Sequence, residues 1–320
     1  CRASNYVALL RKALKDMDME QIPVVSVNMS GLESNPGFNL LSPKLIKRAL
    51  MGMIYGDLFM RVLYKTRPYE AVHGSADELF EKWSRVARRN VYTGSMRKFK
   101  TTIASIVRDF DALPLQEGLK KPKVGVVGEI LVKYHPNANN DIVSIIEQEG
   151  GEAVVLDLID FFMYGMHSKE FNYRNLSGTS KQAFGNKVAI KVVEWFRKPL
   201  RKALRESKRF HEPSHIEHIA EKAQEVASLG NQCGEGWLLA GEMVELIDDG
   251  VENIVCMQPF ACLPNHVTGK GMMKPLRKRN PKANIAAIDY DPGASDVNQL
   301  NRIKLMMATA HKNLQDTDKE

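Results

Sequence analysis

The 320-residue sequence is poor in cysteine, with four residues in all, and no two of them are separated by only two positions. The absence of a Cys-x-x-Cys pair excludes a zinc finger or a ferredoxin-type run, in which one or two short loops supply the ligands. So few cysteines also suit a reducing cytoplasm better than a disulfide-rich secreted domain. Any metal site built on these cysteines therefore has to be assembled by the fold.

Long hydrophobic runs are missing as well. The longest apolar stretches, at 124–127 and 153–156, have the length of strands and are too short to cross a membrane. The start of the chain lacks the basic, apolar and small-residue segments of a secretion signal, so we expect a cytoplasmic protein without a membrane partner. The chain also lacks an initiator methionine, which predicts that it is the excised part of a longer polypeptide.

Three common catalytic motifs are absent. The sequence contains no Gly-x-x-x-x-Gly-Lys-Ser/Thr, no Gly-x-Gly-x-x-Gly after a predicted strand, and no Gly-x-Ser-x-Gly. The pattern therefore indicates neither ATP hydrolysis, nor nicotinamide binding, nor α/β-hydrolase chemistry. Any chemistry is expected to come from a bound metal.

Basic residues outnumber acidic ones, giving a net charge of +7 and a pI near 9.1. They are spread along amphipathic segments with acids between them, and the densest cluster, at 274–282, has no interleaved aromatic residues for base stacking. This distribution predicts solvated surfaces and no nucleic-acid partner. The net positive charge is still compatible with an acidic partner protein or with a cofactor that bears a nucleotide.

The length and the periodicity predict two α/β domains, at residues 1–118 and 119–320. The first, incomplete at its N-terminus, contains an amphipathic helix at about 2–16, a buried strand at 22–28 and long helices at 43–66 and 76–111. A proline- and glycine-containing linker at 113–122 ends it.

The second half restarts as a strand–helix–strand unit, with a strand at 123–129, a helix at 141–149 and a strand at 153–157. Further strands are expected at 253–257 and 284–289. Covering helices are expected at about 186–207, 213–229, 235–249, 268–279 and 295–313. The predicted fold class is α/β, with two Rossmann-like domains, parallel sheets and a ligand site in the cleft between them.

Three cysteines, Cys1, Cys233 and Cys262, are predicted to open helices. The positive end of a helix favours thiolate over thiol and so favours metal ligation. We therefore predict that these three residues are metal ligands, whereas Cys256, in a strand interior, is a core residue. The alternative is that all are small buried hydrophobes without a role.

Other polar residues are expected at the same carboxyl edge of the sheet, where open α/β sheets bind ligands. Glu129 and His135, after the first strand of the second half, are the candidates for catalytic proton transfer. Gln258, Asn265 and Gly234 are predicted to bind the cofactor, since a glycine lets the backbone approach a ligand closely.

Four segments carry a resemblance to a known family. They are Cys1-Arg-Ala-Ser-Asn-Tyr, Asn35-Pro-Gly-Phe, Cys233-Gly-Glu-Gly and Gln258-Pro-Phe-Ala-Cys-Leu-Pro-Asn-His266, followed by Ala-Ile-Asp-Tyr-Asp-Pro-Gly-Ala-Ser. Together they resemble the activase-related members of the 2-hydroxyacyl-CoA dehydratase and benzoyl-CoA reductase family. The resemblance implies a 4Fe–4S cluster held by Cys1, Cys233 and Cys262. It also implies a separate ATP-hydrolysing activator that supplies low-potential electrons, and acyl-CoA or another small molecule as substrate.

Three functions follow from these observations. The first is an iron–sulfur component of a dehydratase or reductase system, a lyase or oxidoreductase if it is an enzyme. The second is an N-terminal nucleophile hydrolase using Cys1, which the helical periodicity after Cys1 disfavours because that fold opens with a strand. The third is a non-catalytic scaffold that binds zinc, with His266 completing a Cys3His set. A homo-oligomer is left open.

Overall fold

The computed structural model describes residues 5–25, 42–291, 293 and 295–317. Helix α1 (Tyr6–Asp16) confirms the predicted N-terminal helix within this range. The strand predicted at 22–28 is wrong for residues 22–25, because Ile22 N donates to Met19 O (3.0 Å) in a turn that follows α1. The rest of that predicted strand, and Cys1, lie outside the described residues.

The next three helices are α2 (Pro43–Thr66), α3 (Ser75–Thr93) and α4 (Met96–Asp111), with a 3₁₀ turn at Arg67–Tyr69. Helix α2 has its predicted bounds, but the single helix predicted at 76–111 is wrong. Gly94 takes a left-handed conformation (φ +66°) that ends α3, and the hydroxyl of Ser95 then accepts a hydrogen bond from Lys98 N (3.4 Å) at the start of α4. A glycine that ends one helix and a serine that begins the next therefore divide the segment that hydrophobic periodicity predicted as one helix.

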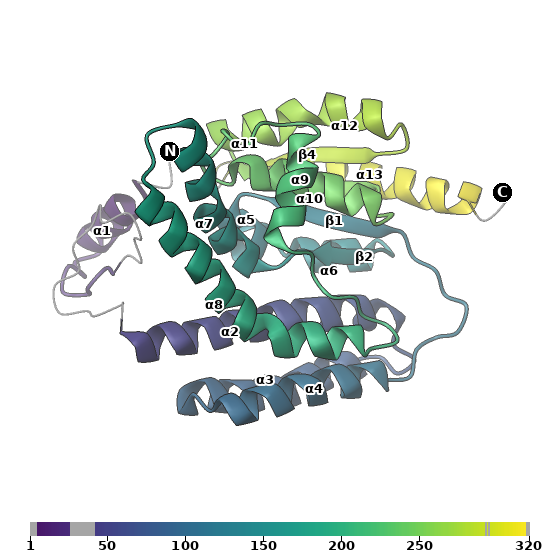
Figure 1. Cartoon of the computed structure of the whole chain (residues 1–320). Helices are drawn as coiled ribbons and strands as arrows, with labels where there is room; N and C mark the ends of the chain where they lie inside the picture. The colour runs from purple at the N-terminus through teal and green to yellow at the C-terminus, as the bar shows by residue number, and fades with distance from the viewer. Residues whose placement is uncertain (1–4, 26–41, 292, 294, 318–320) are drawn as a thin grey trace.

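The sheet has four parallel strands, β1 (Lys123–Gly128), β2 (Glu152–Val155), β3 (Asn253–Pro259) and β4 (Asn284–Tyr290), in the order β2-β1-β3-β4 (Figure 1). The chain leaves β1 to form β2 on one side and returns later to form β3 on the other side. The sheet thus has a switch point between the carboxyl ends of β1 and β3, where open α/β sheets bind ligands. The four strands predicted after residue 119 and their parallel arrangement are confirmed.

Helices cover both faces of this sheet. The first face packs against α5 (Ile130–Tyr134), α6 (Ile142–Gln148) and α13 (Asp296–Thr317); the second packs against α10 (Gly236–Asp248), α11 (Leu263–Thr268) and α12 (Met273–Arg279). Val255 and Met257 of β3 enter the first core, and Ile254 and Cys256 enter the second. Burial on both faces explains the nearly continuous apolar sequences of the strands.

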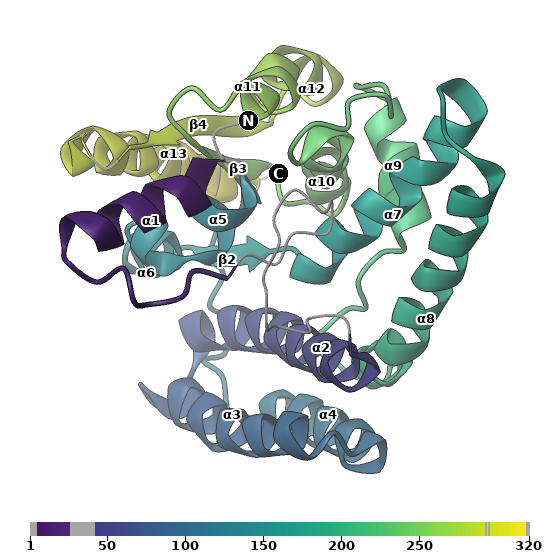
Figure 2. The ribbon, with the colours of Figure 1, turned by 90° about the vertical axis from the view of Figure 1, so that its left-hand side faces the viewer.

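A second, helical core lies beside the sheet. Helices α2, α3 and α4 share it with α7 (Leu158–Asn175), α8 (Ser180–Arg205) and α9 (Ile216–Gln224) (Figures 1 and 2). Asp57 of α2 accepts hydrogen bonds from Leu158 N (2.8 Å) and Ile159 N (3.2 Å) at the start of α7, a helix that the sequence analysis missed. Side chains from both sides of residue 118 thus build one core, and the division at 118 stays a prediction.

Two further expectations differ from the structure. Before Lys123 the described residues form helices and no named strand, so the first parallel sheet is not found among them. The helix predicted at 268–279 is divided, because a 3₁₀ turn at Lys270–Met272 separates α11 from α12; another such turn lies at Pro136–Ala138. Within the described residues, no helix combines the length and the apolar character that crossing a bilayer requires.

Candidate functional site

The switch point of the sheet brings the turn after β1 against the end of β3. Gly128 has φ +144°, and a Cβ at this position would lie 1.9 Å from Met257 O. The next residue, Glu129, donates its backbone N–H to the same oxygen (2.9 Å). Only glycine permits this approach, so the local sequence Gly-Glu places the carboxylate of Glu129 at the carboxyl edge of the sheet.

The loops that carry Cys233 and Cys262 touch each other at this edge. Gly234 has φ +59°, and a Cβ added there would lie 3.1 Å from Pro264 Cβ. Gly236, two residues further on, has φ +49° and leaves no room for a Cβ, which would lie 2.1 Å from Asn231 O. The fold therefore brings two of the three predicted cysteine segments together, with Gly234 packed closely against the Pro264 ring, while the cofactor-binding role of Gly234 stays a prediction.

The two thiols differ in their surroundings. Cys233 is exposed, whereas Cys262 is 7% exposed. Burial raises the pKa of the Cys262 thiol, and the nearby Glu235 and Glu129 raise it further, while a hydrogen bond from the backbone of Asn265 opposes them. The expectation that a helix start favours thiolate is thus not met at Cys262, because α11 is short and burial outweighs its N–H groups.

The sequence analysis missed Glu235, the acid between Cys233 and α10. Its side chain is 6% exposed, and its Oε1 accepts a hydrogen bond from Ile130 N (3.0 Å). Burial raises the pKa of Glu235 to about 7; the Ile130 N–H opposes this shift, and the neighbouring Glu129 adds to it. Its position between two glycines, just before the helix predicted at 235–249, was the available signal.

Asn265 connects the elements of this edge. It is fully buried, and with its amide oriented to satisfy both neighbours it donates to Glu235 Oε2 (2.6 Å) and accepts from Glu129 N (2.8 Å). One side chain thereby joins the turn after β1, the start of α10 and the Cys262 segment. We name this group, formed by Glu129, Glu235 and Asn265, the carboxyl-edge cluster.

The other predicted site residues have different surroundings. Glu129 caps α5, where its Oε2 accepts from Val132 N (3.0 Å), and burial raises its pKa. Gln258 is fully buried and donates to Asp289 Oδ1 (2.8 Å), so it makes a structural contact between β3 and β4.

His135 is exposed and does not line the neighbouring cavity. Cys256 lies in the core as predicted, and burial raises its pKa to about 12.

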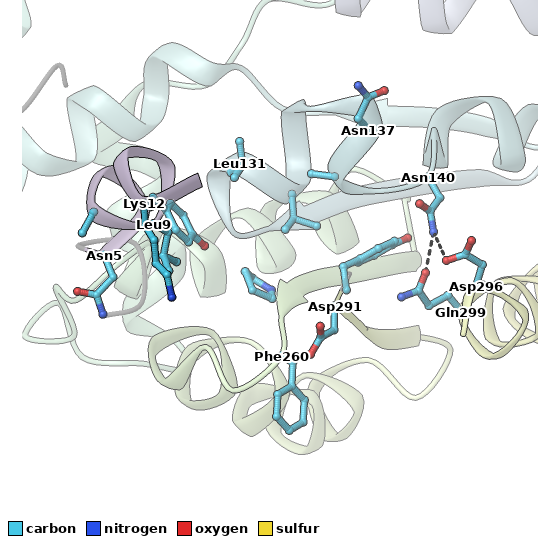
Figure 3. Close-up of a pocket in the computed structure, with 16 residues that line it drawn as sticks. Asn5, Leu9, Lys12, Leu131, Asn137, Asn140, Phe260, Asp291, Asp296 and Gln299 are labelled. Carbon is cyan, nitrogen blue, oxygen red and sulfur yellow. Dashed lines mark hydrogen bonds between the residues drawn. The ribbon is translucent and has the colours of Figure 1, made fainter. Parts of the chain in front are cut away.

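A cavity of about 920 Å³ lies at the same edge of the sheet, between α1 and the carboxyl ends of β3 and β4 (Figure 3), and the three residues of the cluster are not among those that line it. Leu9, Leu131 and Phe260 provide apolar surface, and Figure 3 shows Asn140 bonded to Asp296 and Gln299 at one side. The hydroxyl of Tyr290, which also lines the cavity, is buried and has no hydrogen-bond partner in the described part of the chain. The volume is that of a small-molecule pocket.

A complete metal-ligand set is not seen. Among the residues that the structure describes, no three His, Cys, Asp or Glu side chains lie close enough together to hold a metal ion. The third predicted ligand, Cys1, is outside that range. Cys233 and Cys262 therefore represent the part of the predicted cluster site that the structure can place.

Comparison of the chain with protein-family models, with curated proteins and with solved structures found no significant match. The family resemblance thus rests on the sequence segments quoted above.

Proposed function

We propose that this chain is the iron–sulfur component of a 2-hydroxyacyl-CoA dehydratase- or reductase-like system, and that it receives low-potential electrons from an ATP-driven activator. The observation that supports this proposal is the contact between the Cys233 and Cys262 loops through Gly234 and Pro264. Their meeting place is the switch point of a parallel sheet, the usual ligand site of such folds. Cys1, which lies outside the described residues, is the third ligand on the evidence of its predicted helix-start position and of the resemblance.

The residues present suit a cluster with one buried and one open side. Cys262 lies in the interior and Cys233 at the surface, so together they would hold a cluster at the protein boundary. A bound cluster supplies one-electron chemistry, with a potential set by hydrogen bonds and by exclusion of water. The surrounding loops exclude water, because the three side chains of the carboxyl-edge cluster are at most 6% exposed.

Glu235 is the best placed acid of the site. Its carboxyl is held by Ile130 N and Asn265, so its orientation is fixed by the short helices α5 and α11. Burial raises its pKa to about 7, so this carboxyl can hold and release a proton near neutral pH, as a general acid or base must. We therefore assign the proton-transfer role to Glu235 in place of Glu129 and His135.

The cavity at the same edge of the sheet is the proposed substrate pocket. Among the described residues, its lining combines apolar side chains with one lysine, Lys12, and two aspartates, Asp291 and Asp296. This composition suits the acyl part of an acyl-CoA better than its phosphates, which would require several cationic groups.

The test is the iron and acid-labile sulfide content of protein purified without oxygen, with an electron paramagnetic resonance spectrum after reduction. We expect about four irons and four sulfides per chain and a reduced-cluster signal. Cys262→Ala should lose the iron, while Cys256→Ala, a cysteine buried in the core of the same region, should retain it. Full iron retention in Cys262→Ala, or zinc without iron after anaerobic reconstitution, would contradict the proposal; zinc alone would favour the scaffold.

A further inference from the structure

Helix α8 presents four large apolar side chains to solvent. Phe184 is 71% exposed, Val188 44%, Val192 47% and Trp195 49%. Their spacing of four, four and three residues places them in one row along about three helical turns. We call this row the α8 stripe.

The stripe is a fixed surface and not a frayed end. The opposite side of α8 is buried in the helical core through Ile190, Val193, Phe196 and Leu200, and the helix packs against α7, α4 and α2. Figure 2 shows α8 along the outer edge of the molecule, beside α7. A helix that is well packed on one side and apolar on its outer side marks an interaction surface.

A row of lysines follows one side of the stripe. Lys187 and Lys191 directly precede Val188 and Val192 in the sequence, and Lys198 continues the row one turn beyond Trp195. All three are exposed, and none has a carboxylate within 4.0 Å among the described residues. The one acid of α8, Glu194, is paired with Arg197 (3.2 Å) and Arg201 (2.8 Å).

We propose that the α8 stripe and its lysine row dock an acidic amphipathic helix of a partner protein. Phe184, Val188 and Val192 form a ridge of residues four apart, which fits the groove between the equivalent ridges of another helix. The lysines lie beside the ridge, so the complementary helix carries Asp or Glu beside its apolar residues. This inference does not depend on the proposed iron–sulfur function.

Charge distinguishes this occupant from a second copy of the chain. A second copy of the same face would place lysine rows near each other without opposing acids, which is unfavourable. An anionic membrane would also attract these lysines and the exposed Lys181 and Lys202 of α8, so binding to phosphatidylserine vesicles is an outcome of the test below.

The test is a calorimetric titration with a synthetic amphipathic helical peptide that has leucines spaced four, four and three apart and a glutamate before each. A peptide with lysines in place of the glutamates is the first control. The protein is compared as wild type, as Lys187→Glu/Lys191→Glu/Lys198→Glu, and as Lys274→Glu/Lys278→Glu/Lys282→Glu. The last variant changes the net charge equally at exposed lysines in and after α12.

We expect the α8 variant to bind the acidic peptide about tenfold or more weakly, since each surface ion pair contributes roughly a factor of two to five. The α12 variant should change the affinity by less than about twofold, because its charges are distant and screened. Equal losses in the two variants would overturn the proposal. So would no binding of the acidic peptide, binding only to phosphatidylserine vesicles, or a dimer that the α8 variant dissociates.

Discussion

Replacing Gly236 by alanine tests whether the loop that carries Cys233 is as tightly packed as the structure indicates. A Cβ at Gly236 would lie 2.1 Å from Asn231 O and 2.3 Å from Tyr164 Oη. Gly250, at the other end of α10, is a matched control, because it also has a positive φ (+77°) but has nothing within 4 Å of its added Cβ. Both variants lose stability because alanine is strained in the left-handed backbone conformation, and only Gly236→Ala also loses stability through steric overlap.

The two costs can be estimated separately. An alanine in the left-handed conformation costs about 1 kcal/mol, which is the whole effect expected for Gly250→Ala. At position 236 the Asn231 carbonyl must also move away, which weakens its hydrogen bond with Trp237 N (2.7 Å). Overpacking adds about 1–3 kcal/mol and the weakened hydrogen bond about 0.5–1.5 kcal/mol. The expected loss for Gly236→Ala is therefore about 2.5–5.5 kcal/mol.

Urea unfolding of both variants measures the free energies, and the rate at which a thiol reagent modifies Cys233 reports the position of the loop. We expect Gly236→Ala to lose at least about 1.5 kcal/mol more than Gly250→Ala, because of the overlap and the weakened hydrogen bond, and to change the reactivity of Cys233. Equal losses for the two alanines, with unchanged Cys233 reactivity, would refute the packing argument.

Two further predictions concern buried charges. Burial raises the pKa of Glu245 to about 7, so its ionisation destabilises the fold as the pH rises from the unfolded-state pKa towards 7. Between pH 5 and pH 8, wild type should lose about 2.5 kcal/mol more unfolding free energy than Glu245→Gln, and parallel pH profiles in urea unfolding would contradict this. Lys133→Met should cost about 3–5 kcal/mol, because it leaves Glu242, whose Oε1 lies 2.9 Å from Lys133 Nζ, buried without a counter-charge. The double variant Lys133→Met/Glu242→Leu should recover most of that loss in the same assay, and no recovery would contradict the pairing.

Elements with strong local signals were predicted correctly from the sequence. The four strands are apolar runs that a parallel sheet buries on both faces, and α2 begins at Ser42-Pro43, a cap followed by a proline in the first turn. The burial of Cys256 followed in the same way from its place in the run that forms β3. The loop glycine Gly234 and the buried Asn265 were also placed at the carboxyl edge by this reasoning.

The features that were not predicted from the sequence have a common cause: the residues that stabilise each of them lie far apart in the chain. Helix α7 does not separate apolar from polar residues cleanly, and its start is stabilised by Asp57 of α2, about a hundred residues earlier. Glu235 gains its surroundings from Ile130 and Asn265, which belong to the short helices α5 and α11. No local pattern reports such neighbours.

The sequence by itself determined the parallel sheet, its switch-point edge and the cysteine segments that follow it, because hydrophobic periodicity and glycine turns act over a few residues. Only the tertiary structure decided that α2, α3 and α4 join the helical core with α7 and α8. It also decided that Glu235 is the buried acid beside Cys262, and that α8 keeps an apolar, lysine-flanked face in solvent. These features depend on which elements pack together, and packing is set by contacts between residues that are distant in the chain.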